Sequence, residues 1–184
     1  DWLYLSDYAD VAISYGGNDS IYGYGGDDDI WGGEGADYIN GGLGYDYARY
    51  DYATGGVYVR LDTGLGYSGE AAGDVFASIE GLVGSGYSDT LVGDANSNDL
   101  FGQGGDDFLY GEAGKDQLFG DLGADTVVGG EGSDLLAAGA RKGLDLGDRG
   151  DDLLDGGAGN DTLYGSAGNT LLFGGEGDDL IVGG

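Results

Sequence analysis

The sequence contains no cysteine, proline, methionine or histidine. The missing cysteine excludes disulfides, thiolate metal sites and a thiol nucleophile. The missing histidine removes the commonest general base and the commonest side-chain ligand of zinc and copper. There is also no run of about 18 apolar residues, so we expect no membrane-spanning helix.

Basic residues are scarce, with 6 Lys and Arg against 35 Asp and Glu, and the formal net charge is −29. This balance argues against a nucleic-acid partner, because phosphate binding needs a basic surface. Such acidity is also typical of disordered chains. However, the hydrophobic content is 40% and there are 15 tyrosines, which argues against disorder. We therefore interpret the charge as a sign that bound cations are missing from the count.

Glycine, by contrast, is abundant, with 45 residues among 184, and it recurs with a period of nine. From Gly84 the blocks start at 84, 93, 102, 111, 120, 129, 138, 147, 156, 165 and 174 without interruption. Position 1 is glycine in every block except the one that starts at Ala138. Position 6 is usually Asp, and position 8 is usually Leu, Val or Ile. An earlier array starts at 14, 23, 32 and 41, and a worn copy with Asp10 and Ala12 precedes it.

Each block has a direct physical interpretation. Positions 1 to 6 hold glycines where the chain turns tightly. Positions 7 to 9 form a three-residue strand whose central side chain faces inward. One such strand buries little, but stacked copies bury a continuous aliphatic row, as in a solenoid. Two blocks complete one coil, so the pattern predicts two facing parallel sheets.

The acidic turns suggest a hard cation. Calcium prefers six to eight oxygen ligands from carboxylates and carbonyls. Glycine-rich turns can direct their carbonyls inward, and each Asp adds a charged oxygen. Without a cation, stacked turns would place carboxylates roughly 5 Å apart, and their repulsion would oppose folding.

The motif GGxGxD followed by x-aliphatic-x, as in "GGAGNDTLYG" and "GGEGADYING", resembles the nonapeptide repeat of RTX (repeats-in-toxin) proteins. The resemblance implies an all-β, right-handed parallel β-roll of a protein exported by type I secretion, with calcium between turns two blocks apart. It also implies that the lower turn gives its Asp and the carbonyls of positions 2 and 4, and the upper turn its Asp and those of positions 1 and 3. We expect about six to ten calcium ions.

The predicted carboxylate ligands share position 6, and the predicted glycine carbonyls stand at positions 1 and 4. The carboxylates are Asp19, Asp28, Asp37, Asp46, Asp89, Asp107, Asp116, Asp125, Asp134, Asp152, Asp161 and Asp179. The glycines are Gly17, Gly26, Gly32, Gly41, Gly105, Gly114, Gly120, Gly129, Gly132, Gly147, Gly159 and Gly174. The expected pairs are Asp19–Asp37, Asp28–Asp46, Asp107–Asp125, Asp116–Asp134, Asp134–Asp152 and Asp161–Asp179, with Asp89–Asp107 weaker because Tyr87 replaces a glycine.

Some blocks depart from the motif. Asn98 and Thr170 replace the position-6 Asp, so we expect weak or empty sites there. Block 138–146, "AGARKGLDL", places Arg141 and Lys142 where ligands belong. We favour a decayed, solvated turn; the alternative is a cationic side chain that replaces calcium between Asp125 and Asp161. The register there is uncertain because Gly143-Leu144-Asp145 imitates the motif two residues late.

The segment 50–83 interrupts the repeat. Val57, Val59 and Leu61 alternate as on one face of a strand, and a second stretch supplies Phe76, Ile79 and Leu82. We therefore expect a first β-roll block at 1–49, with 1–13 as a worn cap, irregular bridging coils at 50–83, and a second block at 84–184. The last motif leads us to expect further repeats beyond Gly184.

The outward positions 7 and 9 of the second array are rich in apolar residues. The uninterrupted phase places Phe108, Tyr110, Val128, Leu144, Leu146, Tyr164, Leu180 and Val182 on one sheet, and Phe101, Phe119, Leu135, Leu153, Leu171 and Phe173 on the other. We favour an ordinary sheet surface partly covered by neighbouring segments; the alternative is lateral assembly, adhesion or glycan stacking.

Two function classes remain, and in neither do we expect this chain to be an enzyme, since it has no HExxH or GxSxG motif. The first is a secreted, calcium-folded structural or adhesive module of the cell exterior or surface, whose partners are other copies or cell-surface polysaccharide. The second is an accessory module of a larger secreted polysaccharide-acting enzyme or toxin.

Overall fold

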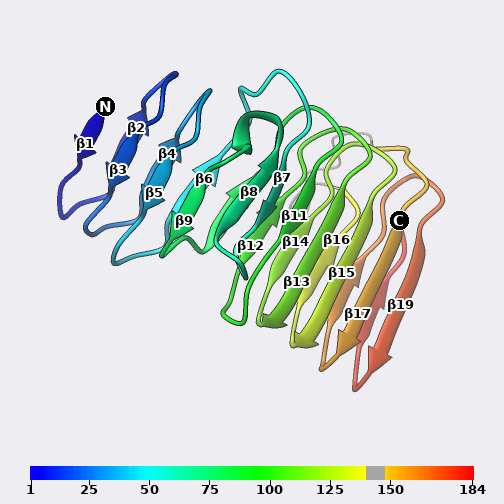
Figure 1. Cartoon of the computed structure of the whole chain (residues 1–184). Helices are drawn as coiled ribbons and strands as arrows, with labels where there is room; N and C mark the ends of the chain where they lie inside the picture. The colour runs from blue at the N-terminus through cyan, green and yellow to red at the C-terminus, as the bar shows by residue number, and fades with distance from the viewer. Residues whose placement is uncertain (140–147) are drawn as a thin grey trace.

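The computed structural model describes residues 1–139 and 148–184, and the described chain is built of short strands in two sheets. The strands advance along one stack from the N- to the C-terminus, as the colour gradient in Figure 1 shows, except that β7, β8 and β9 follow in reverse order. The eleven-stranded sheet runs β1 (Trp2–Tyr4), β3 (Ser20–Tyr22), β5 (Tyr38–Asn40), β9 (Val75–Ala77), β8 (Leu65–Ser68), β7 (Tyr58–Arg60), β11 (Thr90–Val92), β13 (Phe108–Gly114), β15 (Thr126–Gly132), β17 (Leu153–Ala158) and β19 (Leu171–Glu176).

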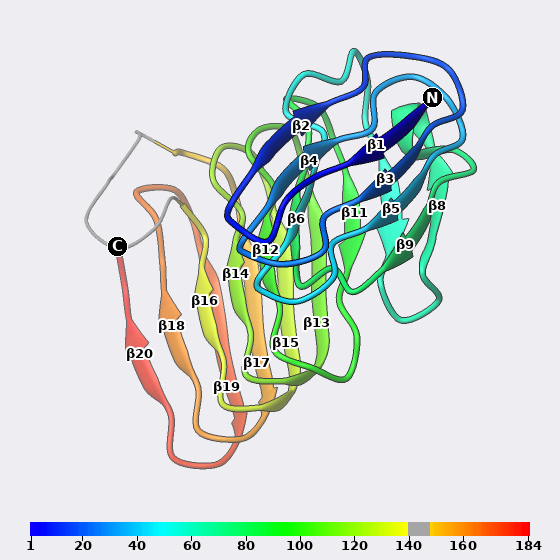
Figure 2. The ribbon, with the colours of Figure 1, turned by 90° about the vertical axis from the view of Figure 1, so that its left-hand side faces the viewer.

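The nine-stranded sheet faces it across the core (Figure 2). Its order is β2 (Val11–Ile13), β4 (Asp29–Trp31), β6 (Tyr47–Arg49), β10 (Gly81–Val83), β12 (Asp99–Phe101), β14 (Gln117–Phe119), β16 (Leu135–Ala137), β18 (Thr162–Tyr164) and β20 (Leu180–Val182). All its pairings are parallel, so the predicted two-sheet, all-β parallel roll is confirmed. Only one short 3₁₀ helix, η1 (Gly69–Ala71), occurs in the described residues, and no described helix is long and apolar enough to cross a membrane.

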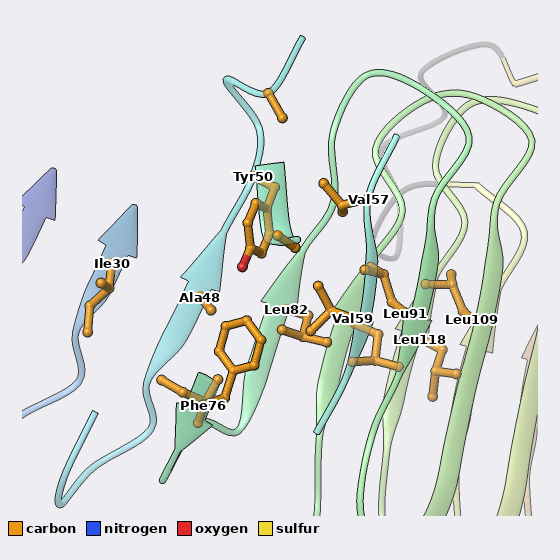
Figure 3. Close-up of a cluster of buried hydrophobic side chains, with 14 of the residues drawn as sticks. Ile30, Ala48, Tyr50, Val57, Val59, Phe76, Leu82, Leu91, Leu109 and Leu118 are labelled. Atoms are coloured by element: carbon orange, nitrogen blue, oxygen red, sulfur yellow. The ribbon is translucent and has the colours of Figure 1, made fainter. Parts of the chain in front are cut away.

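The core is the row of position-8 side chains. Because side chains alternate along a strand, each three-residue strand sends one side chain inward. Parallel pairing then stacks like residues, for example Ile21 on Ile39 and Leu91 on Leu109. Rows from the two sheets meet between them, as Figure 3 shows for Ile30, Ala48 and Leu82 of one sheet and Val59, Leu91 and Leu109 of the other. Most of these side chains have no exposed surface.

The segment 50–83 contributes strands to both sheets. Strand β8 runs antiparallel to both β7 and β9, which is the only departure from parallel pairing in the described sheets. Val59, Phe76 and Leu82 continue the buried row across this segment. Strand β10 pairs with β6 of the first array and β12 of the second, so the hydrophobic core is continuous.

The predicted register after residue 138 is wrong. β15 pairs with β17 and β16 with β18, so partners are 27 residues apart instead of 18. Ala138 lies at position 1 of a turn, since its N–H donates to the carbonyl of Tyr164, as glycine does in the other blocks. Asp148 to Asp152 lead into β17, and Asp152 takes position 6 of this coil. The additional separation of the paired strands equals one period of the repeat, so the spacing of the glycines in the sequence does not reveal it.

This shift corrects two further expectations. Asp134 is stacked with Asp161 and not with Asp152, and Asp125 is stacked with Asp152, so Asp125 and Asp161 stand on different edges and do not flank one site. Strands after the insertion also lie in the opposite sheet to the one predicted. Leu153, Leu171 and Phe173 share the eleven-stranded sheet with Phe108 and Tyr110, while Tyr164, Leu180 and Val182 lie in the other. The expectations for Gly147, Arg141, Lys142, Gly143, Leu144, Asp145 and Leu146 lie outside the described residues.

Candidate metal centres in the turns

The turns form two edges of the roll. Edge 1 holds the turns that lead into the eleven-stranded sheet, and edge 2 those that lead into the nine-stranded sheet. Along each edge, the backbone N–H of one position-6 residue donates to Oδ1 of the Asp in the next coil at 2.8–3.0 Å. On edge 1 the donor and acceptor pairs are Asp19–Asp37, Asp89–Asp107, Asp107–Asp125 and Asp125–Asp152. On edge 2 they are Asp10–Asp28, Asp28–Asp46, Asn98–Asp116, Asp116–Asp134, Asp134–Asp161 and Asp161–Asp179.

Glycine lets these turns stack. Gly26 and Gly44 occupy position 4 in successive coils with φ of 101° and 145°, a region that side chains disfavour. A Cβ on Gly44 would collide with the carbonyl oxygen of Gly26. The backbone can therefore pack coil on coil only where this position lacks a side chain.

The second carboxylate oxygen of most of these Asp residues has no partner. The Oδ2 atoms are buried and accept no hydrogen bond in Asp19, Asp28, Asp37, Asp46, Asp107, Asp116, Asp125, Asp134 and Asp161, and the same holds for Asp148, which is not a member of these pairs. Burying a charged oxygen without a partner is costly unless a cation compensates it. Each Oδ1 therefore holds the coils in register, and each Oδ2 is left available to a metal ion.

A backbone carbonyl converges on the same place. A Cβ on Gly129 would lie 2.5 Å from Asp134 Oδ2 and 2.5 Å from the carbonyl oxygen of Gly156 in the next coil. We call this space, beside the first residue of a turn, the cradle. Cradles with an unpartnered Oδ2 and an upper-turn carbonyl lie beside Gly23, Gly41, Gly102, Gly111, Gly120, Gly129 and Gly156. Two of the expected ligand types, a lower-turn Asp and an upper position-1 carbonyl, thus share one space.

The electrostatics of these turns favour the binding of a cation. Burial raises the pKa of Asp107 to about 8 and the pKa values of Asp116 and Asp125 to about 7, and neighbouring carboxylates add to the rise. Among the described residues, no three acidic side chains converge on a single metal-sized site. A metal ion in these turns would therefore take most of its ligands from backbone carbonyls, which suits a hard cation that prefers oxygen.

Some turns are closed by their own hydrogen bonds. In the turn at 84–89, Ser85 N–H donates to Asp89 Oδ2, and Tyr87 N–H donates to Ser85 Oγ at 3.0 Å. In the turn at 93–98, Asp94 N–H donates to Asn98 Oδ1 at 2.7 Å, and Asn96 N–H donates to Asp94 Oδ1 at 2.7 Å. A Ser or Asp at position 2 thus forms a local turn that satisfies the position-6 side chain. These turns offer an ion fewer free oxygens.

The same closure occurs near Thr170, where Ser166 N–H donates to Thr170 Oγ1 at 3.2 Å and Gly168 N–H donates to Ser166 Oγ at 3.3 Å. Ser166 Oγ also donates to Asp152 Oδ2 at 2.9 Å. Asp89 and Asp152 therefore lie where they were predicted in their turns, but their second oxygens already have donors. The remaining predicted position-6 carboxylates have an unpartnered Oδ2, apart from the partly exposed Asp179.

The nonapeptide pattern does not predict two carboxylates of segment 50–83 that accept hydrogen bonds from position-6 residues. Asp37 N–H donates to Asp74 Oδ1 at 2.8 Å, and Asp46 N–H donates to Glu80 Oε2 at 2.9 Å. Both residues therefore continue, across the interruption, the rows of N–H to carboxylate hydrogen bonds along the two edges, which we call the ladders. The only available signal was an acid just before an aliphatic stretch, as in Glu80-Gly81-Leu82-Val83, without the preceding glycines.

The profile of the family described as "RTX calcium-binding nonapeptide repeat (4 copies)" matches residues 4–39, 13–48, 83–118, 110–140, 146–172 and 171–184. A search among curated proteins found no match. Because the matches cover most of the chain, the protein belongs to the RTX calcium-binding nonapeptide repeat family. The buried, unpartnered Asp oxygens and the carbonyls beside them fit the calcium that this family binds.

Proposed function

We propose that this chain is a secreted structural or adhesive module that calcium folds outside the cell. The observation that carries the proposal is the row of buried Asp Oδ2 atoms without donors on both edges. Calcium supplies the positive charge and the coordination that these oxygens lack. At the low calcium level of the cytosol the turns would repel one another, which would keep the chain unfolded for export.

In this proposal, the two carboxylate oxygens of each position-6 Asp have different roles. Oδ1 of each position-6 Asp fixes the spacing of two coils by accepting a backbone N–H, for example from Asp116 to Asp134. Oδ2 and the cradle carbonyls hold the ion. The position-8 row then buries its aliphatic side chains between the sheets, so metal binding and core formation depend on each other.

The adhesive part of the proposal is supported by the outer face of the eleven-stranded sheet. After the corrected register, Phe108, Leu171 and Phe173 lie on the same sheet and are 41%, 63% and 54% exposed. Leu153 and Leu171 are paired neighbours on this sheet, whereas Thr126 separates them from Phe108 and Asp155 lies beside Phe173. Exposed apolar surface marks interaction sites where it is contiguous. Bound calcium would lower the self-repulsion of the chain and let this face meet another copy or a polysaccharide.

We propose that the chain itself does not catalyse a reaction, because its buried carboxylates are engaged in holding the coils together and it contains no histidine or cysteine. The second candidate, an accessory module of a larger secreted polysaccharide-acting enzyme or toxin, uses the same calcium chemistry. The same lack of histidine and cysteine would then leave catalysis to another part of the full-length protein.

A calcium titration followed by circular dichroism tests the proposed function. We expect a largely unfolded spectrum in metal-free buffer and a β spectrum in millimolar calcium. Magnesium is the matched control, since it demands a small octahedral site and dehydrates reluctantly. A full β spectrum in metal-free buffer would contradict calcium-dependent folding. Light scattering of the wild type and of Phe108→Ser with Tyr110→Ser then tests the adhesive part, because the double variant should fold normally but associate less.

A further inference from the structure

The junction between the first array and segment 50–83 contains a cradle that no nonapeptide repeat completes. Gly41 is the first residue of the turn at 41–46, and a Cβ there would collide with both Asp46 Oδ2 and the carbonyl oxygen of Ser78. In the regular cradle beside Gly23, the same two positions are held by Asp28 Oδ2 and the carbonyl of Gly41. The carbonyl of Ser78 therefore lies where the first glycine of a repeat would place its own.

Glu80 takes the place of the next position-6 Asp. Its Oε2 accepts the N–H of Asp46 at 2.9 Å, just as Asp46 Oδ1 accepts the N–H of Asp28 at 2.8 Å one coil earlier. Only Ile79 separates Ser78 from Glu80, whereas a repeat has four residues between positions 1 and 6. The longer glutamate side chain compensates for the shorter turn.

Two further features distinguish this junction as a place for an ion. Asp46 has no exposed surface, and its Oδ2 accepts no hydrogen bond. Ser78 has φ of 50°, a conformation that costs energy for a non-glycine residue. This conformation directs the backbone through the short turn that brings its carbonyl to the cradle. The unpartnered Oδ2 of Asp46 and the carbonyl oxygen of Ser78 thus lie beside the same cradle.

Edge 1 offers a comparison at the same level of the stack. There Asp74 continues the ladder from Asp37, but Tyr50 donates its hydroxyl hydrogen to Asp74 Oδ2 at 2.7 Å. The three atoms nearest to a Cβ on Gly32 belong to Asp37 and Ile39, so no upper-turn carbonyl approaches it as closely as Ser78 approaches Gly41. A tyrosine hydroxyl therefore already engages the second oxygen of Asp74, the edge-1 counterpart of Glu80, although Asp37 Oδ2 itself has no partner.

We propose that Asp46, Glu80 and the carbonyl of Ser78 form a calcium site that joins the first array to the interrupting segment. Glu80 binds the ion in place of a repeat aspartate, and the site carries the calcium dependence across a stretch without the motif. This inference rests on the proposed calcium-binding function, which supplies the other ions of the edge.

The number of calcium ions bound per chain, measured by equilibrium dialysis and native mass spectrometry, tests the site. Glu80→Gln keeps an oxygen for the N–H of Asp46 but removes the charge, and we expect it to bind one ion fewer than the wild type. Glu80→Asp keeps the charge but shortens the side chain, and we expect the same loss. The matched control is Glu70→Gln, because Glu70 also accepts a backbone N–H in this segment, from Thr54 at 3.0 Å, but lies outside the cradle. It should bind as many ions as the wild type.

The outcomes distinguish a failure of the junction site from a failure of the proposed calcium-binding function. If the wild type binds no calcium, both the proposed function and the junction site are wrong. If the wild type binds several ions and both Glu80 variants bind the same number, only the junction site is wrong. A crystal of the wild-type chain with a lanthanide gives a result that does not depend on variant folding. An anomalous peak between Asp46 and Glu80 would support the site, and an empty junction beside filled repeat sites would overturn it.

Discussion

The hydroxyl of Tyr50 donates a 2.7 Å hydrogen bond to Oδ2 of Asp74, at a level of edge 1 where the repeats leave the equivalent oxygen without a donor. Tyr50 is almost fully buried, so its hydroxyl gives Asp74 the compensation that the proposed calcium would give the repeat carboxylates. Under this proposal, the roll satisfies its buried carboxylates by two chemically different means.

Tyr50→Phe removes this donor and leaves a buried carboxylate oxygen unpaired. We expect the free energy of unfolding in saturating calcium to fall by about 1–3 kcal/mol, the usual cost of such a loss. Urea unfolding measures it. Tyr52→Phe is the control, since that side chain is 71% exposed and should change stability little. Equal stability of both variants would show that the hydroxyl does not compensate Asp74.

A comparison of two neighbouring aspartates distinguishes a specific role in calcium binding from the effect of total negative charge. Asp107 is buried with an unpartnered Oδ2, while Asp106 is exposed and accepts the N–H of Ala124 at 3.0 Å. Asp107→Asn should raise the calcium concentration needed for half-maximal folding severalfold, because it removes a charge from the cradle beside Gly102. Asp106→Asn should leave it nearly unchanged. Calcium titrations followed by circular dichroism compare them, and equal shifts would mean that only total charge matters.

The raised pKa values predict how pH acts on the metal-free protein. Burial raises the pKa of Asp107 to about 8 and those of Asp116 and Asp125 to about 7, above the unfolded value of about 4. Folding therefore favours the protonated carboxyls, so the metal-free fold should gain stability as pH falls from about 8 to 4. Calcium competes with these protons, so its apparent affinity should rise with pH over the same range. Calcium titrations at pH 5, 6.5 and 8 check this; an affinity independent of pH would contradict it.

Much of the fold follows from the period, because one inward side chain per three-residue strand fixes the core row and its phase. The position-6 aspartates are visible for the same reason, since each turn repeats one backbone geometry. Glu80 and Asp74 were not predictable, because their turns achieve the same ladder contact with different lengths and without glycine. The three closed turns at Ser85, Asp94 and Ser166 depend on side-chain hydrogen bonds, which the glycine pattern does not encode.

The register after Ala138 gives the last prediction. Asp125 N–H reaches Asp152 Oδ1 at 3.0 Å across 27 residues, and Ala138 and Asp148 to Asp152 together form one turn. Deleting residues 139–147 should therefore preserve every coil, and the variant should keep the calcium-induced β signal and the number of bound ions. Deleting residues 111–119, a block of equal length that contains β14 and Asp116, is the control and should lower the ion count. If the two deletions lost the same number of ions, residues 138–146 would form a coil, as the uninterrupted nine-residue phase predicts.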